Sequence, residues 1–186
     1  MVYFQSDSDS SYNGLDRKRV MASLHIQVIH GSLLQMDVDV IVNAANSHGL
    51  MGGGVAGVIR RVAGSRVEDE ARQCAPISVG KAVLTSAGKT PFQGIIHAPT
   101  MPEPAMRIPV ANVALATRAA LTVADEHQFS SIGIPGMGTG VGGVSVIDAG
   151  NAMIWEIRQF QPKFLHTVVL VDIDASMIDA WKKHLD

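Results

Sequence analysis

The sequence contains little cysteine and no long apolar run. Cys74 is the one cysteine among 186 residues, which excludes an internal disulfide framework and indicates a reducing compartment. No stretch approaches the roughly 18 consecutive apolar residues that a membrane-spanning helix requires. From these two absences we expect a soluble, cytoplasmic protein without a membrane partner.

Charged and metal-binding residues do not gather into clusters either. The formal net charge is −2, and the basic clusters are limited to Arg17–Arg19 and Arg60–Arg61. The sequence therefore predicts no duplex DNA partner. The seven histidines lack the paired spacing that is typical of metal ligands. We expect no metal and no cofactor.

The first twenty residues differ from the rest of the chain. Residues 1–20 are polar and lack the apolar segment of a signal peptide, and Tyr3–Ser6 resemble the end of a protease-cleavage tag. We predict that part of this segment is a tag remnant and leave it out of the fold. Since the chain is 47% hydrophobic, residues 21–186 suffice for one sizeable core, and we expect a single domain.

From Leu24 onward, short apolar runs alternate with helical patterns. The predicted strands are 24–30, 38–42, 81–85, 94–98, 132–135 and 167–173. The predicted helices are 55–63, 67–74, 109–124, 145–160, which Ser145 caps, and a last helix capped by Ser176. Val38–Val42 is rich in β-branched residues and predicts a strand buried on both faces. This alternation predicts an α/β protein, a three-layer αβα sandwich.

Two loops at strand-to-helix junctions are unusually rich in glycine. Gly52–Gly54 follow the strand at 38–42, and Gly136–Gly143 follow the strand at 132–135. Glycine lets backbone N–H groups approach an anion, and the dipole of a following helix favours negative charge. Neither loop ends in the Gly-Lys-Ser/Thr of a Walker motif, and the dinucleotide fingerprint is matched only imperfectly. We expect the loops to clamp a diphosphate; the alternative is that the glycines only form tight turns.

Two asparagines follow the strand at 38–42, just before the first glycine loop. An amide offers both a donor and an acceptor, which suits the hydroxyl groups of a sugar. For Asn43, nearer the strand, we favour a structural role in tying the strand end to neighbouring backbone. For Asn46, nearer the loop, we favour contact with a ligand.

Several segments, taken together, resemble the signature of the macro domain family. They are Gly31, Val38–Asn46, Gly52–Val55, Gly80–Gly88, Ile95–Ala98, and Ile134–Pro135 with the glycine loop that follows. The resemblance spans residues 24–185 in the same order. It implies a mixed central sheet and binding of ADP-ribose or a derivative. Some members also remove ADP-ribosyl groups from proteins or nucleic acids, or deacetylate O-acetyl-ADP-ribose.

The resemblance also implies roles for individual residues. Gly52–Val55 would cradle the diphosphate and distal ribose, and Gly138–Gly142 would close over it. Asn46, the candidate catalytic residue, would orient the distal ribose, while Ser32 and Leu33 would lie beside the adenine. The full set of expected ligand-binding residues is Ser32, Leu33, Ala45, Asn46, Gly52, Gly53, Gly54, Val55, Pro135, Gly138, Thr139, Gly140, Val141 and Gly142.

Three features depart from the family's usual pattern. Ser32 replaces an aspartate that accepts a hydrogen bond from the adenine amino group. Gly142 and Val144 stand where many members have an aromatic residue. Ala56 replaces the aspartate of efficient mono-ADP-ribosyl hydrolases. Because the matched motif then lacks a general base, we expect slow or absent hydrolysis.

Three functions are therefore open at this point. The first is a module that binds ADP-ribose or a derivative and slowly removes ADP-ribosyl or acetyl groups. The second is a reader of ADP-ribose without chemistry, and the third is a phosphatase acting on a nucleotide-sugar phosphate. In the first two, an ADP-ribosylated protein or nucleic acid is a further partner.

Overall fold

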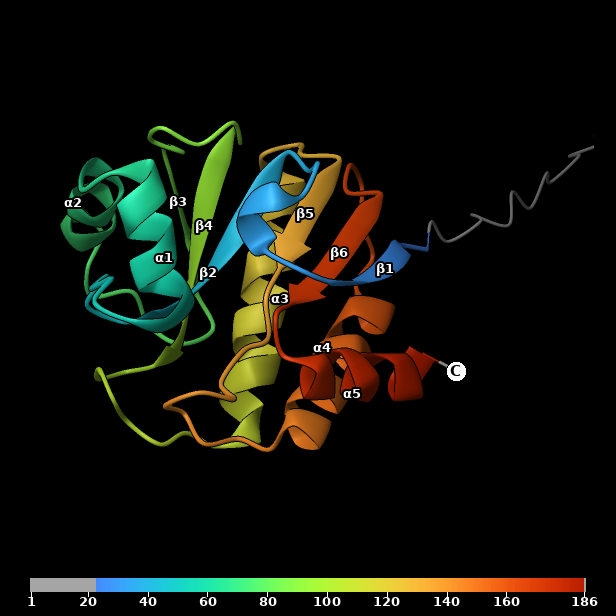
Figure 1. Cartoon of the computed structure of the whole chain (residues 1–186). Coiled ribbons are helices and arrows are strands. Elements are labelled where there is room, and N and C mark those ends of the chain that lie inside the picture. The colour runs from blue at the N-terminus through green and yellow to red at the C-terminus, as the bar shows by residue number, and fades with distance from the viewer. Residues whose placement is uncertain (1–22, 186) are drawn as a thin grey trace, which may run out of the picture.

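The computed structural model describes residues 23–185, which form one sheet with helices on both of its faces (Figure 1). The polar segment predicted for residues 1–20 lies outside the described residues. Within residues 23–185, no helix has the length and apolar character needed to cross a membrane.

The sheet is mixed and has six strands. They are β1 (His25–His30), β2 (Val40–Asn46), β3 (Val83–Thr85), β4 (Gly94–Met101), β5 (Ser131–Ile134) and β6 (Thr167–Asp172). Their order across the sheet is β1-β6-β5-β2-β4-β3. All neighbouring pairs are parallel except β3 and β4, which are antiparallel. The carboxyl ends of five strands therefore meet at one edge, where such sheets bind ligands.

Five α-helices and one short 3-10 helix cover the sheet. They are η1 (Leu33–Gln35), α1 (Gly54–Ala63), α2 (Arg66–Gln73), α3 (Val110–Glu126), α4 (Val146–Gln159) and α5 (Ala175–Leu185). One hydrophobic cluster joins the sheet to α1 and α2, and another joins it to α3, α4 and α5. Figure 1 shows these two groups of helices on either side of the sheet. The predicted three-layer αβα sandwich is confirmed.

Strand β2 shows how one strand serves both cores. Val40 and Val42 pack in the cluster with α3, α4 and α5, whereas Ile41 packs in the cluster with α1 and α2. Side chains alternate between the two faces of a strand, so a run of apolar residues fills both cores. All three side chains have no exposed surface, as predicted for a strand buried on both faces.

Two strands are longer than the sequence predicts. β2 continues through Asn43 to Asn46, so both asparagines lie within the strand rather than beyond it. β4 continues through Pro99 to Met101, although the proline predicted an end at Ala98. β3 pairs with β4 only as far as His97. Pro99 thus lies where one side of β4 has no strand partner, a position that tolerates a missing N–H.

The predicted cap of the last helix is wrong. Helix α5 already begins at Ala175, so Ser176 lies within its first turn. The carboxylate of Asp174 accepts hydrogen bonds from the Ser176 N–H at 2.9 Å and from the Ser176 hydroxyl at 2.7 Å. A side-chain acceptor just before a helix satisfies one of its free N–H groups, and here that acceptor is Asp174. The other predicted serine cap, Ser145 of α4, is confirmed by a 3.1 Å bond from the Asp148 N–H.

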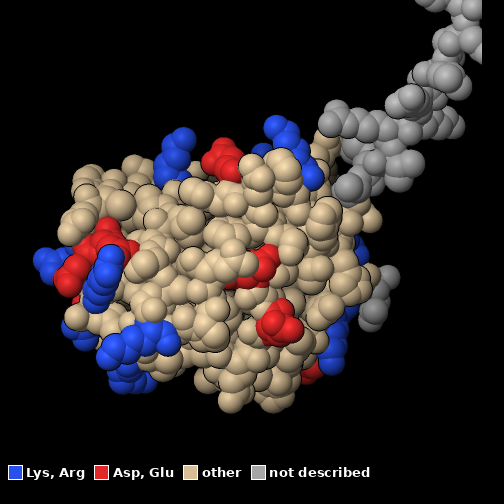
Figure 2. Space-filling view, turned by 90° about the horizontal axis from the view of Figure 1, so that it is seen from above, with Lys and Arg blue, Asp and Glu red and all other residues tan. Residues whose placement is uncertain are grey.

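One face of the molecule shows how charge is distributed over the surface. Figure 2, seen from above the view of Figure 1, is mostly uncharged, with Lys and Arg standing mainly near its edge and interspersed with Asp and Glu. The described part of this face carries no broad basic surface of the kind that duplex DNA requires.

Candidate ligand-binding site

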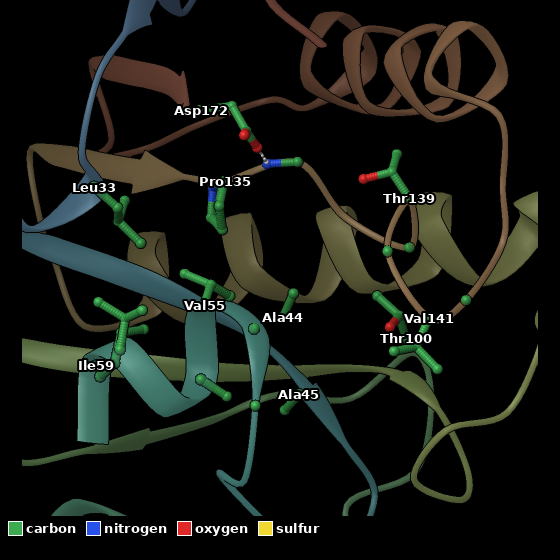
Figure 3. A pocket seen from close by; sticks show the side chains of 18 of the residues that line it. Leu33, Ala44, Ala45, Val55, Ile59, Thr100, Pro135, Thr139, Val141 and Asp172 are labelled. Atoms are coloured by element: carbon green, nitrogen blue, oxygen red, sulfur yellow. Dashed lines mark hydrogen bonds between the residues drawn. The ribbon is translucent and has the colours of Figure 1, made fainter. Parts of the chain in front are cut away.

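A cavity of about 920 Å³ opens at the carboxyl ends of the parallel strands (Figure 3). The segments that follow β1, β2, β4, β5 and β6 all contribute to its lining, together with the first turns of α1. A cavity of this size, at this edge of a sheet, is typical of a site for a nucleotide-sized ligand.

The structure brings every residue of the predicted binding set to this one pocket. The lining contains Ser32, Leu33, Ala45, Asn46, Gly52, Gly53, Gly54, Val55, Pro135, Gly138, Thr139, Gly140, Val141 and Gly142. These residues come from three separate segments of the sequence. The structure thus shows that the two glycine loops share one cavity, the arrangement that a two-sided clamp requires.

Sequence patterns missed several lining residues. They include Thr100, Met101, Asp172, Ile173 and Asp174. Asp172 ends β6, a strand with four consecutive buried apolar residues. Ligands bind beyond the carboxyl ends of strands, so the position of this aspartate at the end of a predicted strand could have indicated it. Thr100 and Met101 had no signal, because β4 was predicted to end before Pro99.

The first glycine loop leaves the amino terminus of α1 open toward the pocket. Gly53 is the N-cap of α1, and no side chain caps the helix there. Among the hydrogen bonds of the described residues, none uses the N–H groups of Gly52, Gly53 or Gly54 as donors. A Cβ added at Gly53 would meet no protein atom within 4 Å. Free N–H groups beside empty space at a helix amino terminus suit an anion.

In the second glycine loop, the glycines determine the shape of the loop, whereas those of the first loop leave open space in the pocket. Gly138 has φ +75°, and a Cβ there would lie 2.7 Å from a methyl group of Val113. The carbonyl oxygens of Gly138 and Gly142 accept hydrogen bonds from Val144 at 3.1 Å and from Ile108 at 3.0 Å. Positive φ and close packing both exclude larger residues at Gly138. Here glycine shapes the loop, which forms one wall of the pocket (Figure 3).

The charges in the pocket are acidic. Its lining, within the part of the chain that the structure describes, includes Asp172 and Asp174 but no lysine, arginine or histidine. Hydrogen bonds from the hydroxyl and N–H of Ser176 lower the pKa of Asp174, which is therefore ionised at neutral pH. The described lining therefore offers an anion backbone N–H groups and a helix dipole, but no cationic side chain.

Asp172 ties the end of β6 to the second glycine loop. Its Oδ2 accepts a hydrogen bond from the Gly136 N–H at 2.9 Å, drawn in Figure 3, and its Oδ1 accepts one from the Asp174 N–H at 2.9 Å. A Cβ at Gly136 would lie 2.7 Å from Oδ2 of Asp172. The close approach of Gly136 fixes where the second loop leaves β5.

Asn46 uses its amide within the protein. Its Oδ1 accepts hydrogen bonds from the N–H groups of His48 at 3.1 Å and Leu50 at 3.3 Å, and its Nδ2 donates to the Leu50 carbonyl at 2.9 Å. Asn46 therefore holds the turn that leads into the first glycine loop, and it also lines the pocket. One N–H of its amide remains for a ligand.

Asn43 is a structural residue, as we favoured from the sequence. It is fully buried, and its Nδ2 donates to Nδ1 of His97 at 3.1 Å, although its Oδ1 has no partner. The partner is a neighbouring side chain rather than the backbone that we expected. Nε2 of His97 in turn lies 2.9 Å from the hydroxyl of Thr85. This buried chain of polar groups links β2, β4 and β3.

Potential metal ligands are not gathered in the described residues. Between residues 23 and 185, no three side chains of the His, Cys, Asp or Glu types form a group that could hold a metal ion.

Comparisons with known proteins agree with the fold. The family model for the Macro domain matches residues 42–153. A protein of Aquifex aeolicus is 58% identical over 162 residues, which cover 87% of this chain and 98% of that protein. ADP-ribose glycohydrolase MACROD1 of Mus musculus is 35% identical over 139 residues, which cover 73% of this chain and 42% of that protein.

Solved structures lead to the same family. The macrodomain of Trypanosoma brucei in complex with ADP-ribose superposes with a TM-score of 0.78 at 27% identity, covering 87% of this chain and 69% of that one. The macrodomain of Oceanobacillus iheyensis with ADP gives a TM-score of 0.78 at 25% identity, covering 89% and 92% of the two chains. With a matching family model, a close relative and a shared fold, this chain belongs to the macro domain family.

Proposed function

We propose that this protein binds ADP-ribose or an ADP-ribose derivative in the pocket at the carboxyl ends of its strands. The observation that carries the proposal is the open amino terminus of α1, where free N–H groups of a glycine loop border empty space. The macrodomain structures with ADP-ribose and with ADP support it, because they share this fold.

The pocket suggests how the ligand lies. We place the diphosphate against Gly52–Gly54 and the start of α1, with the second glycine loop over it. The adenine then occupies the end near Ser32, Leu33 and Pro135, where Leu33 is buried and the walls are largely apolar. Apolar walls with a few placed polar groups suit a flat base.

The distal ribose then lies at the opposite end of the pocket. That end contains Thr100 and Val141, which Figure 3 shows well away from Pro135. Asn46 lies at the same end, because its strand partner Met101 directly follows Thr100. The remaining amide N–H of Asn46 is the group we assign to a ribose hydroxyl. Val141 is 62% exposed, so the distal end faces the mouth of the pocket, where an attached protein or nucleic acid has room.

Reading of ADP-ribose without rapid chemistry is the activity that this pocket favours. Ala56 is buried in α1 and offers no base, and Asp172 lies near Pro135, at the adenine end. We expect turnover of ADP-ribosylated protein, ADP-ribosylated nucleic acid and O-acetyl-ADP-ribose to be slow or absent, because the described lining residues that we place at the distal end, Asn46, Thr100 and Val141, include no carboxylate. Turnover assays on these three substrates check this, and rapid turnover of any of them contradicts the reader assignment.

A phosphatase acting on a nucleotide-sugar phosphate is less well supported. A nucleotide-sugar phosphate carries a terminal phosphate with about −1.5 to −2 charge at neutral pH, in addition to the charge of any diphosphate. The described lining has no cationic side chain to offset it, and Asp172 and Asp174 add negative charge.

Calorimetric titration with ADP-ribose tests the binding proposal directly: one ligand per chain is expected, and heats equal to those of buffer alone contradict it.

A further inference from the structure

The segment just before the first glycine loop is held by a carboxylate from another helix. Oε1 of Glu68, in α2, accepts a hydrogen bond from the Met51 N–H at 2.8 Å. Its other oxygen pairs with Nε of Arg60, in α1. Met51 directly precedes Gly52, so this contact joins α1, α2 and the start of the glycine loop.

The same segment is fixed on two further sides. Asn46 bonds both the N–H and the carbonyl of Leu50, and the Met51 side chain, 1% exposed, packs in the core beneath α1 and α2. Residues 46–51 are thus held by an amide, a carboxylate and apolar packing. Gly52–Gly54 receive no such contact, and a Cβ added at any of the three would meet no protein atom within 4 Å.

If a ligand must order a flexible run of three glycines, part of the binding free energy is lost to that ordering. Donors that already point at the ligand cost no ordering on binding, which is the advantage of preorganisation. Glycine has the largest conformational freedom of any residue, so the direction of Gly52–Gly54 depends on how firmly Met51 and α1 fix their two ends. Glu68 contacts Met51 directly, next to the first of these glycines, and it contacts α1 through Arg60 in the last turn of that helix.

We propose that Glu68 is a positioning residue for anion binding, which acts through Met51 to hold the N–H groups of Gly52–Gly54 toward the pocket. The proposal rests on the proposed function for the identity of the ligand. Glu68 does not line the pocket, so its contribution reaches the ligand only through the backbone that it holds.

The ionisation of Glu68 suits this role. Burial alone raises its pKa, but the hydrogen bond from the Met51 N–H and the charge of Arg60 lower it overall, so the group is charged at neutral pH. Hydrogen bonds to a charged acceptor are about twice as strong as those between neutral groups. Arg60 also neutralises a negative charge that would otherwise repel a diphosphate nearby.

Helix α2 offers a matched control two residues further on. Glu70 accepts hydrogen bonds from the Ser86 N–H at 2.7 Å and its hydroxyl at 2.9 Å, and pairs with Nε of Arg66 at 2.8 Å. Glu70 therefore makes the same kinds of contact as Glu68, a backbone N–H and an arginine. Neither Ser86 nor Arg66 lines the pocket, so Glu70 anchors a loop that the ligand does not touch.

The test compares Glu68→Ala, Glu68→Asp, Glu68→Gln and Glu70→Ala for thermal stability and ADP-ribose affinity. We expect Glu68→Ala and Glu70→Ala to lower the melting temperature alike, but only Glu68→Ala to weaken ADP-ribose, by about tenfold, whereas Glu70→Ala changes affinity by less than about threefold. Glu68→Asp keeps the charge but is too short to reach Met51, and should behave like Glu68→Ala. Glu68→Gln keeps an acceptor for the Met51 N–H and should retain most of the affinity.

A second readout needs no ligand. NMR relaxation order parameters of Met51–Gly54 should fall in Glu68→Ala and Glu68→Asp but not in Glu70→Ala. Equal affinities for Glu68→Ala and the parent, or unchanged order parameters in both Glu68 variants, overturn the proposal. Failure of the parent to bind ADP-ribose instead refutes the proposed ligand, and the order parameters then still decide whether Glu68 holds the loop.

Discussion

Replacing Gly53 by glutamate is expected to weaken ADP-ribose binding by at least about 100-fold, or about 2.7 kcal/mol. Gly53 lines the pocket at the start of α1, and the space beside its Cα is empty. A glutamate fills that space and brings a carboxylate close to the diphosphate, where two like charges about 4 Å apart repel by about 4 kcal/mol at a protein surface. Calorimetric titration of parent and variant measures the loss.

Two further substitutions at Gly53 separate bulk and charge from damage to the fold. The Gly53 backbone is extended, with φ −155°, so any residue fits it. We expect Gly53→Ala to bind within about tenfold of the parent, and Gly53→Gln, with the bulk but not the charge, to lie between alanine and glutamate. All three should unfold near the parent's temperature. If Gly53→Glu binds as tightly as Gly53→Ala, the diphosphate does not lie where we place it.

Mild acid is expected to destabilise the protein through a single buried histidine. Burial lowers the pKa of His97 from 6.5 to about 4, opposed only by the charge of Glu70. Between these two values the unfolded chain binds a proton that the folded protein does not, so stability present above pH 6.5 is lost as the pH falls toward 4. From the linkage relation, unfolding should become easier by about 2–3 kcal/mol between pH 7 and pH 4.5. Urea unfolding across this range measures the loss.

The control for this prediction is His97→Gln. Glutamine offers an acceptor and a donor to Asn43 and Thr85 but does not titrate, so the variant should lose less stability than the parent over the same range. Several carboxyl groups of the folded protein have lowered pKa values, among them those of Asp39, Asp125, Glu68 and Glu70. Protonation of these groups therefore destabilises the fold at a lower pH than protonation of His97 does. A parent and a variant with equal pH dependence would show that His97 is not the group responsible.

The part of the site that could be predicted from the sequence is the part formed by short runs of characteristic residues. Glycine runs at strand-to-helix junctions marked both loops, because few other reasons place three glycines before a helix. The end of β2 was misplaced, because Asn43 and Asn46 are poor strand formers and only pairing with β4 keeps them in the sheet. Local propensity does not include that pairing, so a strand ending at Val42 was the natural expectation.

Contacts between elements far apart in the chain could not be predicted from the sequence. The bond from Met51 to Glu68 spans 17 residues, and the bond from Gly136 to Asp172 spans 36. Each depends on how helices and strands pack, which no spacing in the sequence specifies. Asp174 shows the same limit at short range. Both Asp174 and Ser176 are good caps, and only the observed start of α5 at Ala175 decides between them.

We propose that this pocket holds a diphosphate by backbone N–H groups, without a cationic side chain. The most direct measurement is calorimetric titration with ADP-ribose at about 50 mM and about 500 mM salt, because ion pairs with lysine or arginine are screened over this range. We expect one ADP-ribose per chain and a change in affinity of less than about threefold between the two conditions. No binding, or binding that weakens by about tenfold or more at high salt, would contradict it.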